Sequence, residues 1–128
     1  MHKTIPNNFT FISEFKKAEI LGLNKNTGII FRNYEKKYVK NEILKLKQFC
    51  KSYRRKLYLA NDIKLALNLN LDGVYIPAFN KKLKINKNVK KNFIILGSAH
   101  NLKEIKIKEK QGVKIIFISP LFKTKNYK

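Results

Sequence analysis

The sequence predicts an α/β protein with a parallel sheet, and three observations support this fold class. Short runs rich in Ile, Val, Phe and Tyr alternate with stretches whose apolar residues recur at helical spacing. The strand-like runs follow one another at similar intervals, which suits right-handed βαβ crossovers. Several of these runs are apolar on both faces, as strands buried between two layers must be. At 128 residues the chain is expected to form a single domain, residues 1–128.

Six segments are expected to be strands, because each is short and rich in β-branched and aromatic residues. Each is followed by polar residues or by a helical pattern, so strand and helix are expected to alternate six times. In chain order the expected strands are residues 9–15, 27–34, 56–61, 73–79, 92–99 and 112–122.

The clearest helical pattern covers residues 39–53. Its apolar residues form one stripe while its lysines face water, as in a helix packed on a sheet. The stripe consists of Val39, Ile43, Leu46, Phe49 and Cys50. Cys50 is the only cysteine, so no disulfide is expected within the chain. We interpret Cys50 as a small core residue, and a reducing, cytoplasmic location is expected.

Two shorter helices are expected at residues 62–70 and 101–111. Asp62 directly follows a strand and can cap the first of these helices. Asn101 is a suitable N-cap for the second helix, and Gly112 follows its last turn. A strand that ends at an Asn-Asp pair before a helix is typical of the rim of a parallel sheet, where active sites lie.

The formal net charge of +21 can be explained by the amino-acid composition. Lys, Asn and Ile share A/T-rich codons and are all abundant, and the lysines are spread along the whole chain. An AT-biased genome therefore explains the charge better than a nucleic-acid function, and any nucleic-acid binding is expected to be non-specific and salt-dependent. The densest basic stretch, residues 80–92, is expected to be a solvated loop or a frayed helix. No run approaches the length of a membrane span, so no membrane association is expected.

Three segments carry a resemblance to a known family. They are "IIFRNY" (29–34), "YLANDIKLALNLNLDGVYI" (58–76) and "LGSAHNLKEIKIKEKQGVKIIFISPLFKT" (96–124). In this order and at these separations they resemble thiamine-phosphate synthases. The resemblance implies a (β/α)8 TIM barrel that is incomplete here, with about six βα units and without the last two. It also implies joining of hydroxymethylpyrimidine pyrophosphate to thiazole phosphate, with release of pyrophosphate and with Mg2+ as cofactor.

The resemblance also implies site residues at the ends of the expected strands. Arg32 and Ser98 would contact the pyrophosphate, and Thr124 would contact a phosphate. Asn61 would contact the pyrimidine, and Asp62 would bind Mg2+, for which a carboxylate oxygen is a suitable ligand. Arginine can hold a pyrophosphate through two parallel hydrogen bonds, a geometry that lysine does not reproduce. For Asp62, a helix cap is an alternative that is compatible with metal binding.

Some positions depart from the family pattern. Ile30 and Tyr34 replace a Gln and a Lys on either side of Arg32, and Ala78 replaces a second Gln. Asn80 replaces a second metal-binding Asp, and an amide is a weaker, uncharged Mg2+ ligand. The metal site formed by Asp62 and Asn80 is therefore expected to be degenerate. Because the last two βα units, which carry a phosphate site in such barrels, are also missing from the pattern, little or no turnover is expected from this chain.

Three alternatives to synthase activity remain open. His100 lies where the related thiazole tautomerases use a proton-transfer residue, and imidazole suits that role near neutral pH. The chain could instead be a non-catalytic ligand-binding module or a basic nucleic-acid-binding module.

Because an incomplete barrel leaves strand edges unpaired, a homo-oligomer or a completing partner chain is also expected.

Overall fold

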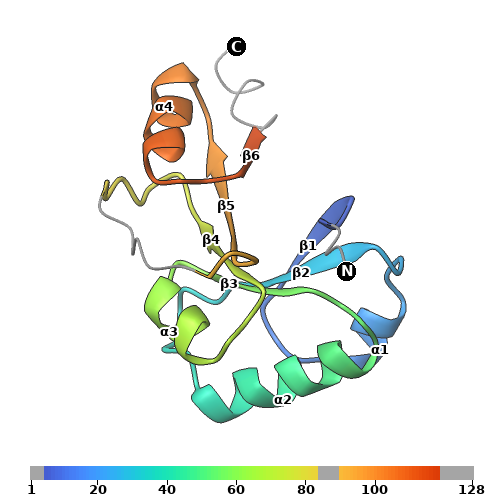
Figure 1. Ribbon diagram of the computed structural model, residues 1–128. Coiled ribbons are helices and arrows are strands. Elements are labelled where there is room, and N and C mark those ends of the chain that lie inside the picture. The colour runs from blue at the N-terminus through green and yellow to red at the C-terminus, as the bar shows by residue number, and fades with distance from the viewer. Residues whose placement is uncertain (1–4, 84–89, 119–128) are drawn as a thin grey trace.

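The computed structural model describes residues 5–83 and 90–118, and these residues form one parallel sheet of six strands (Figure 1). The strands are ordered β1-β2-β3-β4-β5-β6, so every strand lies beside its neighbours in the chain. The sheet curls into a half-barrel, which confirms the predicted α/β class and the incomplete TIM-like barrel. The strands are β1 (Asn8–Ile12), β2 (Thr27–Phe31), β3 (Leu57–Ala60), β4 (Gly73–Ile76), β5 (Ile94–Ala99) and β6 (Ile115–Ile118).

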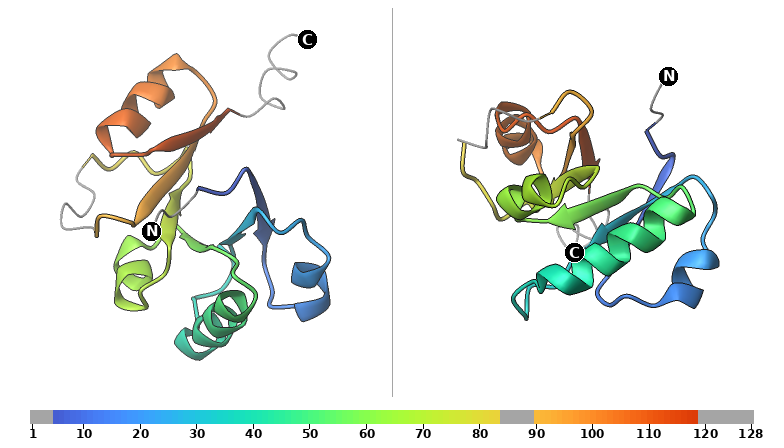
Figure 2. Two further views of the ribbon diagram at one scale, coloured as in Figure 1. Left: turned by 45° about the vertical axis from the view of Figure 1, so that its right-hand side comes forward. Right: turned by 60° about the horizontal axis from the view of Figure 1, so that its bottom comes forward.

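Four helices are described, and they lie on the convex side of the sheet (Figure 2). They are α1 (Lys17–Leu21), α2 (Lys40–Ser52), α3 (Ile63–Asn68) and α4 (Leu102–Lys110). Between β4 and β5 the described residues form turns and irregular chain, so the strand–helix alternation expected from the sequence is not seen there. None of the helices in the described part of the chain is long and apolar enough to cross a membrane.

The central strands are buried on both faces, as their two-sided apolar sequences predict. Every residue of β2, β3 and β4 is buried. In β2, Ile29 and Phe31 pack in the cluster that contains the helix residues, whereas Ile30 packs in a second cluster on the concave face. Successive side chains of a strand point to opposite faces, so the curled sheet has an outer core under the helices and an inner core.

The outer core confirms most of the stripe predicted in residues 39–53. Ile43, Leu46 and Cys50 of α2 are buried, and Phe49 packs against them at the margin. Val39 does not belong to the core, since it precedes the helix and is 56% exposed. Burial raises the pKa of the Cys50 thiol to about 12, so this cysteine is a packed core residue with little thiolate near neutral pH.

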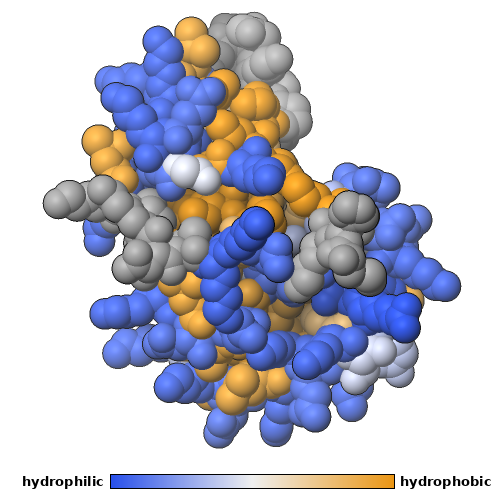
Figure 3. All heavy atoms as spheres, in the orientation of Figure 1, coloured by the Kyte–Doolittle hydropathy of each residue, from blue (hydrophilic) through white to orange (hydrophobic). Residues whose placement is uncertain are grey.

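The inner core is built from aromatic rings that connect the two ends of the sheet. The ring centroid of Phe9 in β1 lies 5.7 Å from that of Tyr58 and 5.3 Å from that of Phe117 in β6. Phe117 also lies 6.2 Å from Tyr75 in β4. Side chains of the first and sixth strands therefore meet although these strands share no backbone pairing. In the space-filling view, hydrophobic residues gather along β5 and β6 (Figure 3).

Two charged residues at the amino-terminal edge of the sheet have structural roles. Asp72 accepts a hydrogen bond from the backbone N–H of Leu57 at 2.8 Å through Oδ2, which links β3 to the start of β4. The Arg55 guanidinium is buried and donates to the carbonyl oxygens of Leu23 and Asn24 at 2.9 Å and 2.5 Å. These charges lie at the edge opposite the strand ends where the predicted site residues are found.

Candidate functional site

The structure brings the predicted site residues to one edge of the sheet. Arg32 directly follows β2, Asn61 and Asp62 directly follow β3, Ser98 lies near the end of β5, and His100 directly follows β5. All strand pairs are parallel, so these residues share the carboxyl-terminal rim, where sites of curled parallel sheets lie.

Two further predicted residues lie differently. Asn80 belongs to the loop after β4 and reaches the same rim, where its side chain contacts Asn61. Thr124 lies outside the described residues.

The guanidinium of Arg32 lies over an aromatic ring. Its guanidinium carbon lies 3.8 Å from the ring centroid of Phe11 in β1, and Phe11 packs edge-on against Tyr75 at 5.0 Å between ring centroids. Guanidinium N–H groups lie in the plane of the group, so stacking on a ring leaves them free to donate to an anion. The arrangement pre-orients the cation for an oxyanion at the rim.

Asn61 adopts a left-handed backbone conformation at the junction of β3 and α3, with φ of 62°. Asparagine tolerates this conformation better than most residues. Its backbone N–H donates to the Tyr75 carbonyl at 2.7 Å, and its Oδ1 accepts from Nδ2 of Asn80 at 2.7 Å. Nδ2 of Asn61 has no hydrogen-bond acceptor among the described residues, so this donor is available to a ligand.

Asp62 caps α3, as its position after the strand predicts. Its Oδ1 accepts a hydrogen bond from the backbone N–H of Leu65 at 3.0 Å. The cap satisfies one of the N–H groups that a helix leaves unpaired at its start. Its predicted role as a metal ligand stays a prediction.

Replacing Asp62 separates these two roles. Asp62→Ala is expected to lower the free energy of unfolding by about 1 kcal/mol through loss of the cap, whereas Asp62→Ser keeps a capping oxygen and is expected to cost less than half of that. Urea denaturation of the three proteins measures the difference. Equal stability of the alanine and serine variants would contradict a capping role. Because serine removes the carboxylate, ligand binding by Asp62→Ser then reports on that group alone.

The donors at the rim do not fit the two-residue magnesium site that the resemblance implies. Both side-chain atoms of Asn80 are engaged, since Nδ2 donates to Asn61 and Oδ1 accepts from the backbone N–H of Lys82 at 3.1 Å. Among residues 5–83 and 90–118, no three His, Cys, Asp or Glu side chains cluster closely enough to hold a metal ion. Asp62 is therefore the one carboxylate of the predicted pair, and Oδ1 of Asn80, an uncharged oxygen, already accepts a hydrogen bond from the loop.

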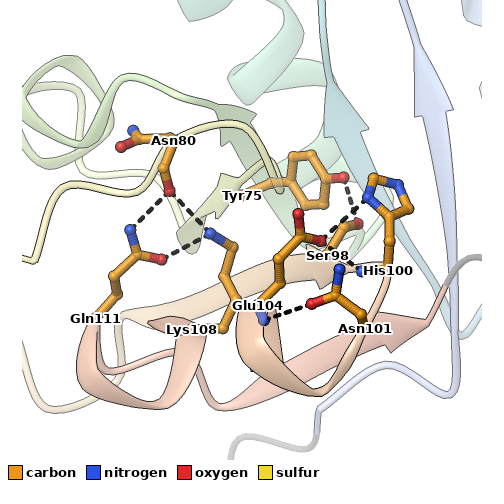
Figure 4. Close-up of polar contacts among 8 residues, drawn as sticks. All are labelled: Tyr75, Asn80, Ser98, His100, Asn101, Glu104, Lys108 and Gln111. Atoms are coloured by element: carbon orange, nitrogen blue, oxygen red, sulfur yellow. Dashed lines mark hydrogen bonds and ion pairs between the residues drawn. The ribbon is translucent and has the colours of Figure 1, made fainter. Parts of the chain in front are cut away.

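A second group of polar residues lies around the end of β5. The Tyr75 hydroxyl and Ser98 Oγ are 2.5 Å apart (Figure 4). His100 contacts Glu104 twice: its Nδ1 lies 3.1 Å from Oε1, and its backbone N–H donates to the same oxygen at 2.7 Å. Asn101 caps α4 by accepting from the backbone N–H of Glu104 at 2.9 Å, as predicted. Glu104 thus holds His100 in place at the start of α4.

Exposed aromatic residues flank the rim. Tyr34, from the loop after β2, and Phe79, from the loop after β4, are 49% and 64% exposed. Their ring centroids are 5.5 Å apart. Tyr34 stands where the resemblance implies a lysine, and partial burial raises the pKa of its hydroxyl. The hydroxyl is therefore neutral near pH 7 and contributes no charge to an anion site.

Sequence reasoning missed several residues of this rim. Phe11 and Tyr75 look like ordinary strand residues, and no local pattern distinguishes them. Glu104 had a signal, because Asn101 followed three residues later by an acid is the pattern of a capping box. Lys108 also had a signal, since it lies three residues after Ile105 on the inward stripe of α4, where an apolar residue is normal.

Comparisons with known proteins agree with the geometry. A family model described as thiamine monophosphate synthase matches residues 14–128. A putative thiamine-phosphate synthase 2 of Aquifex aeolicus is 36% identical over 77 residues, which are 60% of this chain and 41% of the relative. A thiamine-phosphate synthase of Staphylococcus epidermidis is 34% identical over 81 residues, 63% of this chain and 38% of the relative.

A solved structure supports the same fold. A thiamine phosphate pyrophosphorylase from Pyrococcus furiosus superposes with a TM-score of 0.55 and 18% identity, covering 85% of this chain and 58% of that one. At this identity the match shows the fold alone. The matches span about two fifths of the length of the curated relatives.

Proposed function

Because the chain belongs to the thiamine monophosphate synthase family, we propose that its rim binds hydroxymethylpyrimidine pyrophosphate for the synthesis of thiamine phosphate. The observation that carries this proposal is the Arg32 guanidinium, stacked on Phe11 at the end of β2 with its N–H groups available. A stacked guanidinium is suited to paired hydrogen bonds with phosphate oxygens. In the described rim it is the arginine that directly follows a strand.

The other rim residues receive roles consistent with their positions. The Nδ2 group of Asn61 donates to the pyrimidine ring, which packs between the rim and the exposed rings of Tyr34 and Phe79. The Ser98 hydroxyl, paired with Tyr75, donates to a phosphate oxygen. Thr124 is proposed to contact the phosphate of the second substrate, thiazole phosphate.

Calorimetric titration with hydroxymethylpyrimidine pyrophosphate tests the proposal. We expect saturable binding with one ligand per chain that persists at physiological ionic strength. Since a net charge of +21 attracts any polyanion at low salt, inorganic pyrophosphate is the matched control and should bind more weakly. Equal affinity for both ligands, or no binding of the pyrimidine ligand, would refute the proposal. A coupled assay with thiazole phosphate then measures formation of thiamine phosphate.

One observation favours a second function, that of a thiazole tautomerase. Glu104 lies against Nδ1 of His100 and favours a proton on that nitrogen, an arrangement that suits a histidine in proton transfer. His100 would then be the catalytic residue. Loss of tautomerisation, but not of pyrimidine pyrophosphate binding, in His100→Gln would identify this activity.

A further inference from the structure

Two buried polar side chains hold the loop after β4 in place, one from α4 and one from the residue that caps its C-terminal end (Figure 4). Lys108 is completely buried and the adjoining Gln111 is 3% exposed. The Lys108 ammonium donates to the backbone carbonyl of Asn80 at 2.9 Å and to Oε1 of Gln111 at 2.8 Å. Gln111 donates through Nε2 to the carbonyls of Asn80 and Lys82, both at 2.8 Å. We call this pair of side chains the α4 clamp.

The fold leaves space for the clamp. A Cβ at Gly97 in β5 would lie 2.9 Å from Cδ of Lys108, so glycine at this position admits the lysine stem. Burying an ammonium group is costly unless it is fully hydrogen-bonded, and no buried side-chain nitrogen or oxygen in the described residues lacks a partner. Each buried nitrogen and oxygen of the clamp side chains therefore has a hydrogen-bond partner.

The clamp connects directly to the rim. It holds the backbone of Asn80, whose side chain donates to Oδ1 of Asn61 at 2.7 Å and accepts from the Lys82 N–H at 3.1 Å. This contact holds Oδ1 of the Asn61 amide against Asn80 and leaves Nδ2 as its remaining donor. A chain of hydrogen bonds thus runs from α4 through the loop to the residue proposed to contact the pyrimidine.

The same contacts oppose a divalent cation at Asn80. Both atoms of the Asn80 side-chain amide are hydrogen-bonded, and its backbone carbonyl oxygen accepts from both Lys108 and Gln111, so neither of its two lone pairs is left for a metal ion. We infer that the α4 clamp orders this rim in place of a metal ion, so that ligand binding at the rim requires no divalent cation. The identity of the ligand rests on the proposed function, whereas the absence of a metal requirement does not.

Titration of the protein with hydroxymethylpyrimidine pyrophosphate in excess MgCl2 and in excess EDTA tests the metal requirement. We expect the two Kd values to agree within about threefold. A Kd more than about tenfold lower with Mg2+ would overturn the inference. No binding under either condition would refute the proposed function. Whether a metal ion binds at the rim is then tested without the pyrimidine ligand.

Direct titration with a metal ion tests whether the rim binds a divalent cation. Mn2+ is added to the isotope-labelled protein without ligand, and paramagnetic broadening of the backbone amide signals of Asn61, Asp62 and Asn80 is compared with that of exposed residues elsewhere. We expect no selective, saturable broadening at the three rim residues. Selective broadening there would overturn the inference whether or not the pyrimidine ligand binds.

Variants test the positioning role of the clamp. Lys108→Met keeps the length of the stem but removes the ammonium, and Gln111→Met keeps the ammonium but removes the amide. Both are expected to raise the Kd for the pyrimidine ligand about tenfold and to speed amide hydrogen exchange in residues 80–82. Lys110→Met, which removes an exposed charge from the same helix, is the matched control and should change neither. Unchanged exchange in the loop of both clamp variants would overturn the positioning role, independently of the ligand.

Discussion

Arg32→Ala is expected to raise the Kd for hydroxymethylpyrimidine pyrophosphate by about 10- to 100-fold, because hydrogen bonds to charged groups contribute about 1.5–3 kcal/mol. The guanidinium lies over the Phe11 ring at the rim, so the cation is already positioned before the ligand arrives. Little of the binding energy is then spent on ordering the cation. Titration calorimetry at physiological ionic strength measures the change.

Two variants control for charge. Arg54→Ala removes the same charge from an exposed arginine that precedes β3 at the opposite edge of the sheet, and it should leave the Kd unchanged. Arg32→Lys keeps the charge but not the planar fork, so its Kd should lie between those of wild type and Arg32→Ala. An equal loss of affinity in Arg54→Ala and Arg32→Ala would mean that the ligand senses only net charge.

Gly73→Ala is expected to destabilise the protein by about 3 kcal/mol or more, the range of severe overpacking. A Cβ at Gly73 would lie 2.0 Å from the carbonyl oxygen of Ile94 and 2.7 Å from the Tyr58 ring. Gly73 pairs with Ile94 in the β4–β5 ladder, so the carbonyl can move only if this pairing opens. Chemical denaturation monitored by circular dichroism measures the loss.

Gly22→Ala is the matched control. Its Cβ would lie 3.5 Å from the Ala18 carbonyl oxygen, an ordinary contact, and its φ of −77° is open to any residue. We expect its stability to stay within about 0.5 kcal/mol of wild type, as for surface substitutions. Wild-type stability of Gly73→Ala would show that β4 and β5 are not paired in this register.

Local patterns in the sequence were sufficient for the fold class and for the edge at which the site lies. The strands β2, β3 and β4 are apolar on both faces and are buried on both faces. Asp62 and Asn101 both precede helical patterns and both cap helices. Parallel strands end at the same edge of a sheet. An approximate position for the end of each strand was therefore enough to place Arg32, Asn61 and Ser98 at one edge.

Strand ends were less predictable, because the residues that follow these strands are also apolar or aromatic. Residues 73–79 looked like one strand, yet β4 ends at Ile76 and the following residues form the loop that carries Asn80. Pro77 lacks the N–H group that would continue the ladder. The aromatic residue Phe79 is 64% exposed, whereas its type alone suggests a buried strand position.

The sequence by itself determined the order of the six strands and the caps of α3 and α4, since each depends on neighbours a few positions away. Only the tertiary structure decided which side chains meet at the rim. Phe11 supports Arg32, Asn80 orients Asn61, and Lys108 binds the Asn80 carbonyl. Each contact joins different elements of the fold, and its geometry depends on the curl of the sheet and on the packing of α4, which no local periodicity encodes.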